Sequence, residues 1–147
     1  KQLSEQQITV DNLAVMIKKQ LKGKKIDGIT ISGGEPFNQA VEIVKLLELL
    51  NIKGDVLVFS GYLIDEIRKD INKNLLLEKI DVLVDGKYIE EFNDGKSGLR
   101  GSSNQQIHIL SQDIEDKYLE YINEGRKIQN FVYDYKTISV GIHKNSL

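Results

Sequence analysis

Apolar residues recur along the chain with spacings that predict alternating helices and strands. Helical spacing predicts one helix over Val10–Lys22 and another, with a wide apolar face, over Gln39–Leu50. Short runs rich in β-branched residues predict strands over Ile26–Ser32, Asp55–Gly61 and Ile80–Asp85. The middle run is continuous rather than alternating, which is typical of a parallel strand buried on both faces. The alternation of elements therefore predicts an α/β fold with mainly parallel strands.

The connections and the second half of the chain are less regular. A short helix carrying Ile64 and Ile67 and a helical turn over Leu75–Lys79 separate the second and third strands. The run Gly86–Asn104 has no periodicity, and a loop of that length is usually functional or disordered. The remaining predicted elements are a strand over Gln106–Leu110, a helix that Ser111 caps and Gly125 ends, and a terminal β-hairpin formed by Ile128–Asp134 and Thr137–Ile142 around Tyr135-Lys136.

Composition narrows the class of protein. The 147 residues suit a single domain over 1–147, and a net charge of −2 gives no basic field for nucleic acid. No run is long and apolar enough to span a membrane, and no signal peptide is visible, so we expect a cytoplasmic protein. There is no cysteine, which excludes disulfides and a cysteine-ligated metal site within this chain.

The most informative stretch is the turn Gly33-Gly34-Glu35-Pro36, which follows the first predicted strand and precedes the helix over Gln39–Leu50. Such a turn lies at the carboxyl end of a strand, where α/β sheets bind ligands. The two glycines permit unusual backbone angles and close approach of a ligand, and Glu35 adds a carboxylate that suits an ammonium group. Pro36 stiffens the turn. An ordinary strand-to-helix turn is the alternative interpretation.

Two other strands end in similar polar, glycine-containing turns. Ser60 and Gly61 close the second strand, and Asp85, Gly86 and Lys87 close the third. Because the carboxyl ends of parallel strands meet at one edge of a sheet, these turns are predicted to line one crevice with the glycine turn. The alternative is that turns are polar wherever they occur.

Three motifs resemble a known family. The turn Gly33-Gly34-Glu35-Pro36 resembles the GGEP motif of radical S-adenosylmethionine (SAM) enzymes, and the wording Ser-Gly-Gly-Glu-Pro-Phe is closest to activating enzymes of glycyl radical enzymes. The runs Val84–Glu91 and Leu99–Gln105 resemble the activating proteins of anaerobic ribonucleoside-triphosphate reductase. The resemblance covers about Thr9 to Leu110, and the three motifs in this order are specific.

The resemblance implies a fold, two cofactors and a reaction. The fold is a radical SAM partial barrel, in which a 4Fe–4S cluster held by a CxxxCxxC loop binds SAM. One electron cleaves SAM, and the resulting 5′-deoxyadenosyl radical takes a hydrogen atom from a glycine of the reductase. The implied SAM contacts are Gly33, Gly34, Glu35, Pro36, Ser60, Asp85 and Lys87. We expect Glu35→Ala to weaken SAM binding and to leave the fold intact.

The implied partners are the glycyl radical enzyme, namely anaerobic ribonucleotide reductase, and an electron donor such as flavodoxin or ferredoxin. The departure from the family is the missing cysteine loop, which the chain does not contain. We therefore expect a truncated partial barrel without its first strand and cluster loop, inactive alone and able to form homo-oligomers through an exposed sheet edge. The alternatives are an activase or maturase of another protein, and a non-catalytic α/β binding or interaction module.

Three further features carry expectations of their own. The histidines, His108 and His143, have no spacing that indicates a metal site, and we expect His108 in a strand. The loop Gly95–Gln105, which contains Arg100, is expected to shape the opening through which the partner's glycine reaches SAM. The alternative for that loop is a mobile surface segment. Five lysines between residues 18 and 25 suit a solvated helix end, or a contact with an acidic partner.

Overall fold

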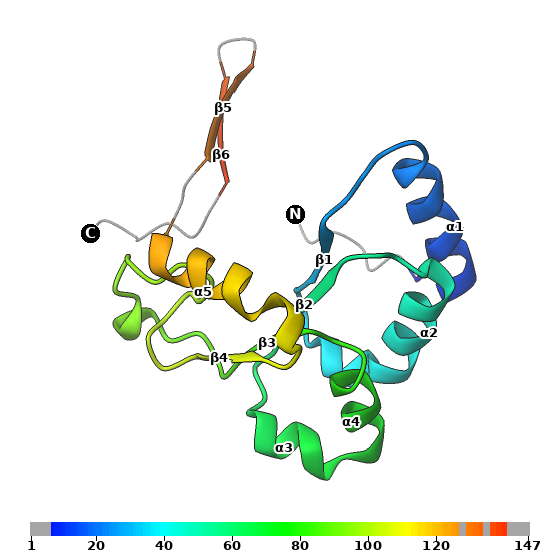
Figure 1. The fold of residues 1–147 in the computed structure, drawn as a ribbon, viewed down its shortest axis with the longest axis horizontal. Helices are drawn as coiled ribbons and strands as arrows, with labels where there is room; N and C mark the ends of the chain where they lie inside the picture. The colour runs from blue at the N-terminus through cyan, green and yellow to red at the C-terminus, as the bar shows by residue number, and fades with distance from the viewer. Residues whose placement is uncertain (1–6, 127–128, 134–135, 141–147) are drawn as a thin grey trace.

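The computed structural model describes residues 7–126, 129–133 and 136–140. A four-stranded sheet with the order β1-β2-β3-β4 forms the centre (Figure 1). Its strands are β1 (Gly28–Ile31), β2 (Asp55–Phe59), β3 (Val82–Asp85) and β4 (Gln106–Ile109). The first three strands are parallel, as predicted, whereas β4 runs antiparallel to β3. The α/β fold is therefore confirmed.

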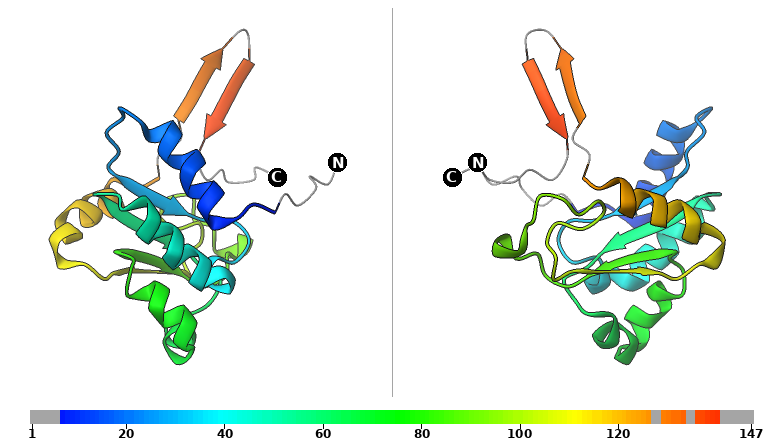
Figure 2. Two further views of the ribbon diagram at one scale, coloured as in Figure 1. Left: turned by 90° about the vertical axis from the view of Figure 1, so that its right-hand side faces the viewer. Right: turned by 60° about the vertical axis from the view of Figure 1, so that its left-hand side comes forward.

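Helices cover both faces of this sheet (Figure 2). One face packs against α2 (Ala40–Leu50), α3 (Ile64–Lys69) and α4 (Ile71–Leu77), and the other packs against α5 (Glu115–Glu124). The helix α1 (Val10–Leu21) lies beside α2. The two faces have separate hydrophobic cores, which account for the continuous apolar runs of the inner strands.

The strand β3 shows how the two cores divide the side chains. Val82, Leu83 and Val84 are all fully buried. Leu83 belongs to the core under α2–α4, together with Val58, while Val82 and Val84 belong to the core under α5, together with Tyr118. Alternate residues of a strand point to opposite faces, so a strand between two helical layers must be apolar throughout.

Two helices differ from their predicted bounds. The predicted turn at Leu75–Lys79 is the end of α4, which begins at Ile71 because the Asp70 carboxylate accepts hydrogen bonds from the backbone of Asn72 and Lys73. The helix α5 begins at Glu115 rather than directly after Ser111, because a 3-10 turn, Gln112–Ile114, lies between them. The side chain of Ser111 makes no capping hydrogen bond.

The terminal hairpin is confirmed as β5 (Gln129–Tyr133) paired antiparallel with β6 (Lys136–Val140), and its predicted turn residue Tyr135 lies outside the described residues. The two strands form a sheet of their own, apart from the main one (Figure 1). No helix in the described ranges is long and apolar enough to cross a membrane. The partial barrel and the single domain remain predictions.

Candidate functional site: the turns after β1, β2 and β3

The turn after β1 leaves its main chain open. Gly33 and Gly34 have φ angles of +87° and +55°, in the region that favours glycine. Both residues are exposed, and no heavy atom lies within 4 Å of the position that a Cβ would occupy at either one. A ligand therefore has room to approach the backbone of this turn.

Glu35 joins the turn after β1 to the turn after β2. Its Oε1 accepts hydrogen bonds from Ser60 Oγ at 2.9 Å and from the Phe37 backbone at 3.1 Å. Its Oε2 accepts a hydrogen bond from the Gly61 backbone at 2.8 Å. Glu35 also stands at the N-cap of the 3-10 helix Pro36–Gln39, whose Pro36 and Phe37 are buried. The carboxylate is therefore occupied by the protein's own donors.

The turns after β2 and β3 lie next to each other. The Ser60 side chain is nearly buried, and its Oγ accepts a hydrogen bond from the Tyr62 backbone at 3.0 Å. The carbonyl of Tyr62 in turn accepts a hydrogen bond from the Gly86 backbone at 3.1 Å. Together with Glu35, these bonds place all three strand ends side by side, and the crevice between them remains a prediction. We call these three turns, residues 33–36, 60–62 and 85–87, the strand-end rim.

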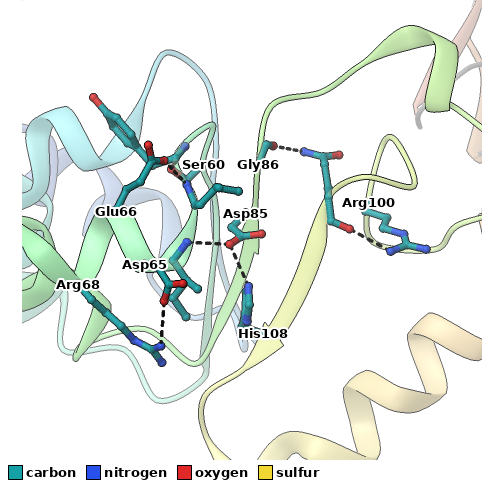
Figure 3. A network of polar contacts seen from close by, with 12 residues as sticks. Ser60, Asp65, Glu66, Arg68, Asp85, Gly86, Arg100 and His108 are labelled. Atoms are coloured by element: carbon teal, nitrogen blue, oxygen red, sulfur yellow. Dashed lines mark hydrogen bonds and ion pairs between the residues drawn. The ribbon is translucent and has the colours of Figure 1, made fainter.

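Asp85 lies at the rim, but its carboxylate is directed into the protein (Figure 3). Its Oδ2 accepts a hydrogen bond from the Ile64 backbone at 2.8 Å, in the first turn of α3, and lies 3.0 Å from His108 Nε2. Neither its buried Oδ1 nor His108 Nε2 has a hydrogen-bond partner among the described residues. His108 is in β4, as expected, opposite Leu83. Asp85 therefore holds the start of α3 against the end of β3, with His108 of β4 beside it.

Lys87 is exposed, and its Cγ lies 3.5 Å from the position that a Cβ on Gly61 would take. Its carbonyl accepts a hydrogen bond from the Asn104 side-chain amide at 2.8 Å. The neighbouring Gln105 is buried and donates from Nε2 to the Gly86 carbonyl at 2.8 Å (Figure 3). Asn104 and Gln105, at the end of the loop 95–105, thus attach this loop to the strand-end rim.

Residues 93–105 are held by an internal network. Arg100 donates to the Gln105 carbonyl at 2.9 Å and to Ser97 Oγ at 3.2 Å. Arg126, which follows α5, donates to Asn93 Oδ1 at 2.8 Å and to the carbonyl oxygens of Arg100 and Gly101. Arg126 could not be singled out from the sequence, because nothing in its local pattern shows that its partners lie 25 to 33 residues earlier.

Asp94 forms a tight turn inside this loop. Backbone hydrogen bonds from Lys96 and Ser97, and then one from the Ser97 hydroxyl, lower the pKa of Asp94 to about 2. Each of these bonds favours the charged carboxylate over the protonated acid.

The rim offers open backbone, the exposed Lys87 and polar side chains that stiffen it. It does not offer ligands for an iron–sulfur cluster, because the chain contains no cysteine. Within the described ranges, no group of three or more His, Cys, Asp and Glu side chains is placed to hold a metal ion. His143 lies outside these ranges.

The chain belongs to the family of 4Fe-4S single cluster domains, which it matches over residues 1–108. Among its relatives, the anaerobic ribonucleoside-triphosphate reductase-activating protein of Haemophilus influenzae is 38% identical over 109 residues. The proteins of the same name from Escherichia coli K12 and Enterobacteria phage T4 are 34% and 32% identical over 111 and 104 residues. These relatives confirm the resemblance seen in the motifs.

The similarity is partial in length. The alignments cover 71%, 72% and 67% of this chain, in the same order, and 64%, 66% and 61% of those three relatives. The chain thus spans less than two thirds of each of them. No solved structure matches the chain significantly.

The hydrogen bonds of Glu35 revise the expectation that Glu35→Ala leaves the fold intact. We predict that Glu35→Ala lowers the free energy of unfolding by about 1–3 kcal/mol, because it leaves the Gly61 and Phe37 amides and the Ser60 hydroxyl without their acceptor. Chemical denaturation measures this loss, with the exposed Glu91→Ala as the matched control. Equal stability of the two variants would show that Glu35 does not join the turns.

The pKa of Asp94 gives a pH-dependent prediction. Because this pKa is about 2 in the folded chain against an ordinary 3.8, the Asp94 turn contributes stability that is fully present above pH 3.8. That contribution is lost as the pH falls through about 2. Carbon-detected NMR titration of the side-chain carboxyl should report the lowered pKa, and an ordinary value would contradict the hydrogen bonds described here.

Proposed function

We propose that this chain is the SAM-binding part of a radical SAM enzyme that activates anaerobic ribonucleotide reductase by generating a glycyl radical. The observation that carries the proposal is the open Gly33-Gly34 backbone in a chain whose relatives bear the name of that activating protein. The cytoplasm, the flavodoxin or ferredoxin donor and a homo-oligomer belong to the same proposal.

In this proposal the backbone of Gly33 and Gly34 receives the ammonium group of SAM. Glu35 acts as a positioning residue, since its carboxylate already accepts three hydrogen bonds from within the protein. Pro36 and Ser60 hold Glu35 in place, and Lys87 is the exposed cation that faces the rest of SAM. Asp85 acts through α3 and β4, because its one hydrogen-bonded oxygen contacts those elements.

The cluster requires thiolates that these 147 residues lack, so we propose that other residues of the whole protein supply them. The partial barrel needs a further strand as well. Within the described residues β1 pairs only with β2, and an apolar groove of about 420 Å³ runs along β1 between α1 and α2. We propose that the additional strand pairs with the free edge of β1 and covers the part of this groove that lies beside β1.

The loop 95–105 is proposed to border the opening through which the reductase's glycine approaches. Gln105 supports this role, since its side-chain amide connects the loop directly to Gly86 at the rim. Ser102 and Gln105 are buried, which favours a shaped border over the alternative of a mobile surface loop.

The proposal is tested with the complete protein, reconstituted anaerobically with iron and sulfide and then reduced. We expect it to cleave SAM to methionine and 5′-deoxyadenosine, and the 147-residue chain treated in the same way to leave SAM intact, because it has no cluster ligands. Chromatography quantifies the 5′-deoxyadenosine. A complete protein that carries its cluster and still does not cleave SAM would exclude the proposed function.

The role of the open backbone has a matched test. Gly33→Ala should weaken SAM binding by the complete protein at least about tenfold, because the new methyl group occupies the space that a ligand needs beside a residue with φ +87°. Gly23→Ala is the control, since Gly23 has φ +75° and equally open surroundings but lies at the end of α1. Calorimetry measures both affinities, and an equal loss in the two variants would assign the effect to backbone strain.

A further inference from the structure

Exposed lysines gather around one hollow at the amino-terminal side of the sheet. The hollow has a volume of about 350 Å³ and lies between the end of α1, the residues before β1 and the turn before β2. The lysines that line it are Lys18, Lys22, Lys24, Lys25 and Lys53. All five are exposed, and no carboxylate is among the residues that line the hollow.

These lysines differ from others in the described part of the chain. Lys45, Lys73, Lys79 and Lys117 each have a carboxylate within 4 Å, whereas the five around the hollow form no ion pair with a described residue. Lys19, Lys69, Lys87 and Lys96 form none either, so what sets the five apart is that they surround one hollow. A cluster of unpaired like charges repels itself, so its presence in a protein of net charge −2 calls for an anionic counterpart.

Helix geometry alone does not account for this cluster. A basic residue in the last turn of a helix is stabilised by the helix dipole, which explains Lys18 at the end of α1. Lys24, Lys25 and Lys53 lie outside any helix, and Lys53 comes from a segment about 30 residues later in the chain. The fold therefore brings two separate segments together to place these lysines around the hollow.

The floor of the hollow is apolar. It is formed by Leu21, Ile26, Leu50 and Ile52. Lysines around an apolar floor match a peptide that carries carboxylates on both sides of an apolar side chain. A nucleic acid fits less well, because the lining has no aromatic residue for base stacking and no arginine.

From this arrangement we propose that the hollow is a docking site for an acidic segment of a partner protein, whose apolar side chain enters between the lysines. The site lies before the first residue of β1, Gly28, while the rim begins after its last residue, Ile31. An occupant of the hollow therefore leaves the strand-end rim accessible. The inference does not depend on the proposed SAM chemistry.

The test uses a fluorescent synthetic peptide with a leucine between glutamates. Its anisotropy on titration with the protein should show binding that weakens as the salt concentration rises from about 0.05 M to about 0.5 M, because salt screens exposed charges. The same peptide with serine in place of leucine should bind at least about fivefold more weakly, because it cannot fill the apolar floor. Equal affinity of the two peptides would overturn the proposal.

The charge-reversal pair Lys25→Glu with Lys53→Glu should weaken peptide binding at least about tenfold. The control pair Lys69→Glu with Lys96→Glu makes the same change in net charge at exposed lysines away from the hollow. Circular dichroism confirms that both variants are folded. Equal losses in the two pairs, or tighter binding of a single-stranded oligonucleotide of the same charge than of the leucine peptide, would show a general electrostatic effect and reject the docking site.

Discussion

The bond network of the Glu35 carboxylate is the constraint on which the strand-end rim depends. Parallel strands are held together along their length by backbone hydrogen bonds, but their turns need other links. Glu35 supplies the link from the turn after β1 to Ser60 and Gly61 after β2. A charged acceptor makes stronger hydrogen bonds than a neutral one, so a single side chain can hold the two turns in register. These hydrogen bonds hold the turn in which the backbone of Gly33 and Gly34 is open.

Polar contacts also link the other turns at the carboxyl ends of the strands. The bond from Gly86 to Tyr62 continues the connection to the turn after β3, and Gln105 carries it into the loop that follows. Arg126 then anchors that loop from the end of α5. The rim is thus built as a series of polar contacts between segments that are distant in sequence. Such contacts permit a rigid site on turns and loops, which otherwise lack the ladder bonds of strands.

The two ends of the sheet have different chemistry. At the carboxyl ends of β1–β3, glycine turns and buried acceptors leave little unpaired charge apart from Lys87. At the amino-terminal side, lysines from two segments surround an apolar hollow. In the two proposals made above, the docking site and the strand-end rim lie at opposite ends of β1, so both can be occupied together.

The sequence by itself determined the α/β alternation, the three parallel strands and the position of the glycine turn, because periodicity and turn residues are local properties. The three sequence motifs also determined the family, which the relatives confirm. Only the tertiary structure decided the direction of β4, the start of α4 at Ile71 and the partners of Glu35, Asp85 and Arg126. A carboxylate that binds a ligand and one that joins two turns look the same in a sequence. What distinguishes them is which donors the fold brings within hydrogen-bonding distance.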